Sequence, residues 1–320
     1  ISDITISAGD TTGTATFDPT DDSVHEGNET AAVTITNVVG ADAGSTTSQT
    51  ITITENDSTP VVTLATSAST IAENAGSSLT LTATLSNATT EDVTVALSTS
   101  GTGTEGTDYS TISDITISAG ATTGTASFTP TDDSVYEGNE TGIVAIDSVS
   151  GGSANESGTP QSVTITITEN ESAPTVTLTT SASSITENAG SSLTLTATLS
   201  VATTADVTVG ISTSGTGTEG TDYSTISDIT ISAGDLTGTA SFTPSDDSVY
   251  EGNETGIVAI STVSGGSATE DGTQSVTITI SENESAPTVT LGTSASSIAE
   301  NAGSSLTLTA TLSVATTADV

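Results

Sequence analysis

The chain contains no lysine and no arginine, although it carries 40 aspartate and glutamate residues among its 320 positions. A single histidine, His25, is the only side chain that can become cationic. Ion pairs between side chains therefore cannot neutralise the carboxylates, so clustered acids repel one another unless metal ions or solvent cations lie between them. The lack of cationic side chains also argues against binding to nucleic acids, which needs phosphate contacts, and to anionic membranes.

Cysteine is absent, which excludes disulfides and thiolate metal sites. Methionine and tryptophan are also absent, and there are three phenylalanines and four tyrosines. No apolar run is long enough to span a membrane, and no signal peptide is visible. The sequence shows no nucleophile–base pair, phosphate-binding loop or cofactor motif, so we predict that the chain is not an enzyme. His25 has no second histidine to share a metal, and we expect it to be a tolerated surface substitution.

What the chain does contain is strict alternation of apolar residues with threonine and serine, as in residues 79–85. A period of two in β-favouring residues, bounded by Gly, Asn and Asp, is typical of half-buried strands. High net charge and few aromatics can also indicate disorder. The ordered alternation favours a folded all-β protein with lean cores of small aliphatic side chains.

The sequence repeats itself. The segment 60–64 recurs at 174–178 and 287–291, and the segment 132–141 recurs at 246–255 and, with His25 in place of tyrosine, at 21–30. A period of this length corresponds to a complete domain rather than a solenoid repeat. Seven strands are predicted in the unit that begins near residue 60: 61–66, 78–85, 93–98, 115–118, 123–129, 142–149 and 163–168. Seven short strands separated by turns predict an immunoglobulin-like β-sandwich.

We therefore expect a beads-on-a-string rod of sandwiches joined by very short linkers that end in proline. The expected division is a C-terminal half-domain at 1–58, complete domains at 59–172 and 173–285, and the N-terminal strands of a further domain at 286–320. Two interpretations of the half-domains stay open. The chain is a window of a longer array, which we favour, or a subunit whose terminal strands complete a neighbour.

The acids of one unit lie in four places: Glu73, the segment 105–108, the segment 132–140 and the segment 169–171. In a seven-strand sandwich the first, third and fifth connections share the end at which the last strand exits, so these acids should converge. Sequence-distant oxygen ligands at one place suit Ca²⁺, which takes six to eight oxygens, better than Mg²⁺, which requires a tight octahedron. The alternative is that these acids are solvated turn residues.

These residues resemble a known family. Glu73-Asn74-Ala75-Gly76, then Gly106-Thr107-Asp108-Tyr109, then Asp132-Asp133 with Glu137-Gly138-Asn139-Glu140-Thr141, and finally Glu169-Asn170-Glu171 are similar to the motifs of the Calx-β domain. The resemblance covers essentially the whole chain and implies Ca²⁺-binding immunoglobulin-like sandwiches, found in sodium–calcium exchangers, integrin β4 and large bacterial surface proteins.

The resemblance implies a set of Ca²⁺ ligands in each unit. Those of the complete units are Glu73, Asp108, Asp132, Asp133, Glu137, Glu169 and Glu171, and then Glu187, Asp222, Asp246, Asp247, Glu251, Glu282 and Glu284. Those of the incomplete units are Asp21, Asp22, Glu26, Glu55 and Asp57, and Glu300. The family often ends in a run of aspartates, and here that run is Glu-Asn-Glu or Glu-Asn-Asp, which affects the number and affinity of the ions.

We predict that the chain is the structural repeat region of an extracellular rod or filament of a bacterial surface adhesin, stiffened by Ca²⁺ at the interdomain joints. Its expected partners are neighbouring copies of the same domain, in tandem or in a filament, and other rods laterally. Two alternatives stay open: a Ca²⁺-sensing regulatory module of a membrane transporter, and a ligand-binding adhesin domain. Near-identical tandem copies favour the structural role.

Overall fold

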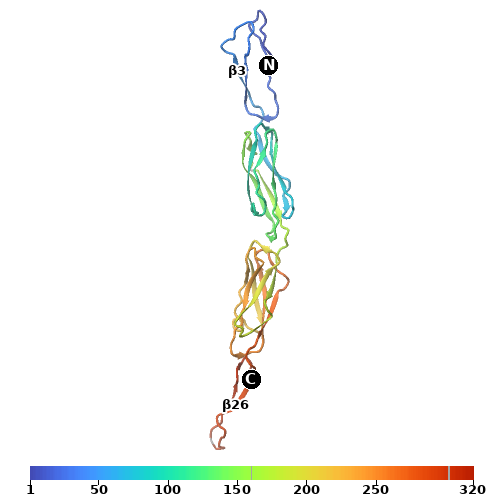
Figure 1. Ribbon diagram of the computed structural model, residues 1–320. Helices are drawn as coiled ribbons and strands as arrows, with labels where there is room; N and C mark the ends of the chain where they lie inside the picture. The colour runs from blue at the N-terminus through green and yellow to red at the C-terminus, as the bar shows by residue number, and fades with distance from the viewer. Residues whose placement is uncertain (160, 302) are drawn as a thin grey trace. The chain divides into compact units, whose positions relative to one another are not determined.

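The computed structural model describes residues 1–159, 161–301 and 303–320, which form 28 β-strands and no helix (Figure 1). The chain divides into two compact units, one of residues 1–132 and 139–170 and one of residues 133–138 and 171–320. Each unit contains one complete β-sandwich with its own hydrophobic core. The predicted all-β, immunoglobulin-like class is confirmed. Within the described residues, no helix is long and apolar enough to cross a membrane.

The sandwich of the second unit has a four-stranded sheet in the order β21-β17-β15-β24 and a five-stranded sheet in the order β16-β25-β23-β19-β20. Its strands are β15 (Thr175–Thr180), β16 (Ser184–Thr186), β17 (Leu193–Leu199), β18 (Ala202–Thr203), β19 (Val207–Gly215), β20 (Ile229–Ile231), β21 (Thr237–Phe242), β22 (Val249–Tyr250), β23 (Glu254–Ser264), β24 (Thr269–Glu270) and β25 (Ser275–Ser281).

The sandwich of the first unit repeats this topology, with sheets in the orders β10-β6-β4-β13 and β5-β14-β12-β8-β9. Its strands are β4 (Val61–Thr66), β5 (Thr70–Ala72), β6 (Leu79–Leu85), β7 (Ala88–Thr89), β8 (Val93–Gly101), β9 (Ile115–Ile117), β10 (Thr123–Phe128), β12 (Glu140–Ser150), β13 (Asn155–Glu156) and β14 (Ser162–Thr168). The short β11 (Val135–Tyr136) belongs to the second unit, where it pairs with β18.

All seven predicted strands of the unit near residue 60 are present, with β4 at the predicted bounds and the others shifted at one or both ends. Strands β5, β7, β11 and β13 were not predicted. Strands of two or three residues are too short to show a period, and they exist because tertiary packing brings a partner strand alongside them.

The alternating pattern places one side of each strand in the core. On β6, Leu81, Ala83 and Leu85 are buried between the sheets, whereas the intervening threonines are not. Each core contains one stacked aromatic pair, which in the first is Tyr109 on Phe128 with ring centroids 4.6 Å apart. Small aliphatic side chains therefore suffice for a closed core in each sandwich.

The incomplete repeats show what the missing half contributes. Their strands are β1 (Val24–His25), β2 (Glu29–Thr34) and β3 (Ser48–Ile53), and β26 (Val289–Thr293), β27 (Leu308–Leu312) and β28 (Ala315–Thr316). Leu308 is 67% exposed, whereas Leu195, at the same place in a complete repeat, is 0% exposed. Burial of these apolar residues therefore depends on the facing sheet.

Candidate metal centre

Three glutamates of the second unit meet where two parallel strands end. β16 pairs with β25 so that Thr186 lies opposite Ser281, and the next residues along are Glu187 and Glu282. Glu187, Glu282 and Glu284 each offer a carboxylate oxygen, and these oxygens lie within 4.8 Å of one another. We call these three residues the strand-end group. The parallel register alone explains why residues nearly a hundred positions apart become neighbours.

A second set of carboxylates, the loop group, consists of Asp222, Glu251 and Glu254, whose oxygens also lie within 4.8 Å of one another. Asp222 lies between β19 and β20, and its Oδ2 accepts a hydrogen bond of 2.6 Å from the Thr218 N–H. Glu251 comes from the loop that leads into β23, and Glu254 is the first residue of that strand. Glu254 and its equivalent Glu140 are absent from the predicted ligand set, although the recurring Glu-Gly-Asn-Glu segment could have indicated both.

The predicted ligands Asp246 and Asp247 belong to neither group but lie beside them. The Asp247 N–H donates to the Glu187 carboxylate, and Asp247 Oδ1 accepts from the Val249 N–H at 2.6 Å. Asp246 Oδ1 accepts from the amide of Asn283 at 3.3 Å. The loop is thus tied to the strand-end group through both aspartates.

Glu282 differs from its neighbours because its two oxygens accept four backbone hydrogen bonds. Oε2 accepts from the N–H groups of Glu251 (2.6 Å) and Gly252 (2.8 Å), and Oε1 accepts from those of Asn283 and Glu284, both at 2.9 Å. Burial raises the pKa of Glu282, but the hydrogen bonds from Glu284, Glu251 and Gly252 outweigh it and hold the pKa at about 2. Glu282 is therefore ionised and braces the acidic loop against the end of β25.

Two other carboxyl groups have pKa values that are raised and not lowered. Burial, followed by the charges of Glu282, Glu284 and Asp247, raises the pKa of Glu187 to about 7 despite the hydrogen bond from Asp247. Burial and the charge of Asp222 are the main causes that raise the pKa of Glu254 to about 7. A nearby cation would remove the main cost of ionising both groups.

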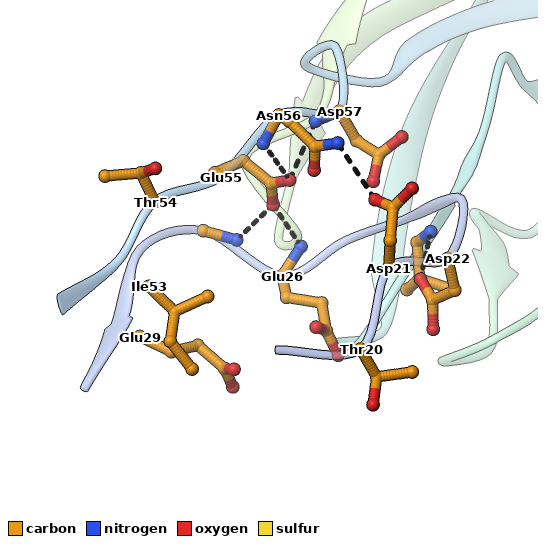
Figure 2. Close-up of a pocket in the computed structure, with 12 residues that line it drawn as sticks. Thr20, Asp21, Asp22, Glu26, Glu29, Ile53, Thr54, Glu55, Asn56 and Asp57 are labelled. Carbon is orange, nitrogen blue, oxygen red and sulfur yellow. Dashed lines mark hydrogen bonds between the residues drawn. The ribbon is translucent and has the colours of Figure 1, made fainter. Parts of the chain in front are cut away.

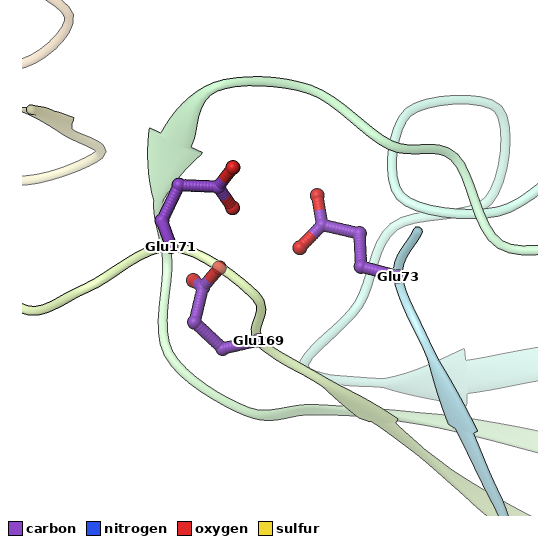
Figure 3. A group of neighbouring side chains, drawn as sticks. All are labelled: Glu73, Glu169 and Glu171. Carbon is purple, nitrogen blue, oxygen red and sulfur yellow. The ribbon is translucent and has the colours of Figure 1, made fainter. Parts of the chain in front are cut away.

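The corresponding residues of the repeat at 59–172 are similarly gathered. Glu73, Glu169 and Glu171 form one group, in which the carboxylates face one another (Figure 3), and Asp108, Glu137 and Glu140 form the other. Asp132 and Asp133 belong to neither, like their counterparts. Glu105 has a different role: it accepts hydrogen bonds from the Thr99 hydroxyl and the Ile112 N–H, both at 2.7 Å, and so fixes the loop that carries Asp108.

The first incomplete repeat places Asp21, Asp22, Glu26, Glu55 and Asp57, together with Glu29, around a small pocket of about 40 Å³ (Figure 2). Glu55 accepts four backbone N–H groups, as Glu282 does. His25 is half-buried rather than a surface substitution, and its Nδ1 lies 3.3 Å from Glu55 Oε2. Glu300, in the last incomplete repeat, is exposed and lies outside the groups described above.

The donor set fits a hard divalent cation. All candidate ligand atoms are carboxylate oxygens, which suit Ca²⁺ or Mg²⁺ rather than a soft metal. Glu284 Oε2 is buried and, among the described residues, has no hydrogen-bond donor. A buried anionic oxygen without a donor beside two further carboxylates is a position where a cation is favourable. Glu187 and Glu284 would hold an ion in the strand-end group, with Glu282 positioning them, and Asp222, Glu251 and Glu254 would hold one in the loop group.

Fold and site together define a tandem array of immunoglobulin-like sandwiches with repeated carboxylate centres. The Calx-beta domain family matches the sequence at residues 55–171 and again at 169–284. The chain therefore belongs to the Calx-beta domain family, and the predicted resemblance is confirmed.

Similar solved structures include a CALX calcium-binding domain pair and bacterial adhesins. The crystal structure of CBD12 from CALX1.2 is 17% identical, with 69% of this chain and 99% of that chain covered and a TM-score of 0.31. The Yersinia pseudotuberculosis adhesin InvE is 14% identical, with 68% of this chain and 58% of that chain covered and a TM-score of 0.31. Invasin, a bacterial integrin-binding protein, is 18% identical, with 77% of this chain and 45% of that chain covered and a TM-score of 0.25. No curated protein matches the sequence significantly.

Proposed function

We propose that the carboxylate centre of each complete repeat binds Ca²⁺ and that the chain is the repeat region of an extracellular rod stiffened by this ion. The observation that carries the proposal is the strand-end group, in which Glu284 Oε2 is buried without a donor and within reach of Glu187 and Glu282. The chain has no lysine or arginine that could supply the missing charge.

Ca²⁺ is favoured over Mg²⁺ by the number and variety of the oxygens. Two groups of three carboxylates, with Asp246 and Asp247 beside them, present more ligands than an octahedral Mg²⁺ site uses. Ca²⁺ accepts six to eight oxygens in irregular geometry, and the ligands here come from four separate segments. When bound, the cation supplies the positive charge that lets these segments approach without repulsion.

The stiffening role follows from where the centres lie along the chain. Each centre includes the last residues of one predicted domain, such as Glu282 and Glu284, so ordering it also orders the start of the linker that follows. We propose the boundaries 59–172 and 173–285 for the complete domains. The millimolar Ca²⁺ outside cells would keep such centres filled, which is why we place the protein on a bacterial cell surface.

Thermal unfolding in Ca²⁺, Mg²⁺ and chelator tests the proposal. Free Ca²⁺ at a hundred times the dissociation constant would stabilise each occupied site by about 2.7 kcal/mol, so the Tm should rise clearly in Ca²⁺ and less in Mg²⁺. In the double variant Glu187→Gln/Glu284→Gln, the Tm of the second unit should no longer rise in Ca²⁺. The control is Asp235→Asn, which removes an exposed carboxylate that belongs to neither group and to no predicted ligand set. Equal Tm values in Ca²⁺ and chelator would refute Ca²⁺ binding.

A further inference from the structure

The acidic loop of each repeat contains a two-residue strand that pairs with the following repeat. Val24–His25 pairs in parallel with Ala88–Thr89 in the first unit. In the second unit, Val135–Tyr136 pairs with Ala202–Thr203, and Val249–Tyr250 pairs with Ala315–Thr316. The register is the same in all three cases, with valine opposite alanine. Because the same register recurs in all three cases, we interpret the pairing as a regular feature of the repeat.

Carboxylates of the candidate centre hold the loop side of this ladder. In the last case, Val249 donates its N–H to Asp247 Oδ1 at 2.6 Å, and the two residues after the strand, Glu251 and Gly252, donate theirs to Glu282. In the first case, Val24 donates to Asp22 Oδ1 at 2.8 Å, and the residues after the strand donate to Glu55. The short strand is therefore fixed at both ends by acids of the centre.

The receiving strand is rigid and belongs to the core of its own sandwich. Thr203 is 2% exposed, its hydroxyl donates to the Ala205 carbonyl at 2.7 Å, and its carbonyl accepts from the Gly234 N–H at 2.8 Å. Gly266, which has a φ of +52°, lies so close that a Cβ there would be 2.7 Å from Thr203 Oγ1. Thr89 is held by the equivalent contacts. This turn is thus a preformed edge for strand addition.

We propose that the acidic loop is a docking edge for the Ala-Thr edge of the next repeat, and that Ca²⁺ occupancy and docking strengthen each other. The inference rests on the proposed function. An ion on the loop group would fix Glu251, which directly follows the short strand, so the ladder would form at lower entropic cost. By linkage, a formed ladder raises the affinity of the loop for the ion by the same factor. Because the contact is made by the main chain, histidine can replace tyrosine at position 25 without changing it.

The test uses Ala202→Pro in the full chain. Proline removes a main-chain N–H and restricts the preceding residue, which should break the ladder with Val135–Tyr136. Ala205→Pro, in the same turn but outside the ladder, keeps the carbonyl that accepts from the Thr203 hydroxyl and is the matched control. Spin labels on cysteines introduced at the exposed positions Thr80 and Thr194 report the distance between the two complete repeats. The natural chain has no cysteine, so these labels are unique.

Pulsed dipolar spectroscopy should show a distance distribution that Ca²⁺ narrows in the parent and in Ala205→Pro. In Ala202→Pro it should stay broad in Ca²⁺, while calorimetry still detects binding with affinity reduced several-fold at that joint. A narrow distribution in Ala202→Pro would overturn the inference, whereas absence of Ca²⁺ binding in the parent would instead overturn the proposed function. Should Ala202→Pro not fold, Ala202→Gly, which keeps the N–H and loosens the edge, should give an intermediate width; an unchanged width would contradict the ladder.

Discussion

The side-chain amide of Asn56 donates a hydrogen bond of 2.9 Å to Asp21 Oδ1, across 35 positions of sequence. In the repeat at 173–285, Asn283 donates to Asp246 Oδ1 at 3.3 Å and also to Glu284 Oε1 at 3.2 Å. The amide thus bridges two carboxylates from different segments, as a metal ion would. Asparagine in the middle of the Glu-Asn-Glu segment therefore replaces part of the positive charge that the centre needs.

Asn283→Asp should increase the number or affinity of bound Ca²⁺ ions. The substitution removes the bridging donor and adds a carboxylate beside Asp246 and Glu284, so repulsion in the ion-free protein rises while a further oxygen ligand appears. We expect a lower Tm in chelator, a larger Tm increase on adding Ca²⁺, and a higher stoichiometry by titration calorimetry. Asn37→Asp adds the same charge at an exposed position outside the centre and should change none of these. Unchanged stoichiometry together with unchanged Tm in chelator would contradict the bridging role.

Glu282→Gln and Glu187→Gln should have different effects although the chemical change is the same. A glutamine at 282 keeps one acceptor oxygen and points an NH₂ group at backbone donors, so the variant should lose about 1–3 kcal/mol in both Ca²⁺ and chelator. A glutamine at 187 removes a buried charge from a crowded group, so the ion-free protein should become more stable while its response to Ca²⁺ decreases. Denaturant unfolding with and without Ca²⁺ measures both. If the two variants behaved alike, Glu282 would be an ordinary ligand and not a brace.

The long strands and the carboxylate segments could be predicted because they leave periodic signals. Alternation marks strands such as β4 and β6, and the recurrence of Asp-Asp and Glu-Gly-Asn-Glu marks the loops. The contacts made by individual residues could not be predicted in this way. Whether Glu282 binds an ion or braces a loop depends on which backbone N–H groups face it, and that is set by the register of β16 on β25.

The same limit explains the missed ladder strands. Val249–Tyr250 has no period and no distinctive composition, and its partner Ala315–Thr316 lies more than sixty residues away. Pairing follows from where the loop and the next turn come together. The burial of His25 could not be predicted for a related reason, because its contact with Glu55 joins two segments that sequence alone does not bring together.

The ion-free protein should be most stable at a pH of about 4.5 to 5 and lose stability towards neutrality. Glu187 and Glu254 have pKa values of about 7 in the folded state, against 4.5 as their ordinary value. Between these values the folded state binds more protons than the unfolded state, so the free energy of unfolding falls as pH rises and levels off above 7. Glu55 and Glu282, with pKa values of about 2, contribute stability that is lost only as pH falls below 4.5.

Ca²⁺ should reverse the loss of stability towards neutral pH, because a bound cation stabilises the ionised carboxylates. The measurement is Tm against pH in buffers stripped of divalent ions and in buffers with Ca²⁺. A stripped protein that is more stable at neutral pH than near pH 5 would contradict the raised pKa values of Glu187 and Glu254.

Gly256→Ala should weaken both the core and the centre. A Cβ at Gly256 would lie 2.7 Å from Phe242 Cε2. Phe242 is fully buried and stacks on Tyr223, with ring centroids 4.6 Å apart. Displacement of its ring would press on Tyr223, which directly follows Asp222 of the loop group in the sequence. We expect a loss of about 1–3 kcal/mol in stability and a weaker Ca²⁺ affinity by calorimetry.

Two further variants identify the cause. Gly158→Ala, where a Cβ meets nothing within 4 Å, should change stability by no more than about 0.5 kcal/mol. Phe242→Leu combined with Gly256→Ala should recover part of the stability lost in Gly256→Ala alone, because the smaller side chain leaves room for the new methyl group. If the double variant is instead less stable by the full sum of the single effects, the clash with the Phe242 ring is not the reason. If stability falls without any change in Ca²⁺ affinity, the aromatic pair supports the core but does not position Asp222.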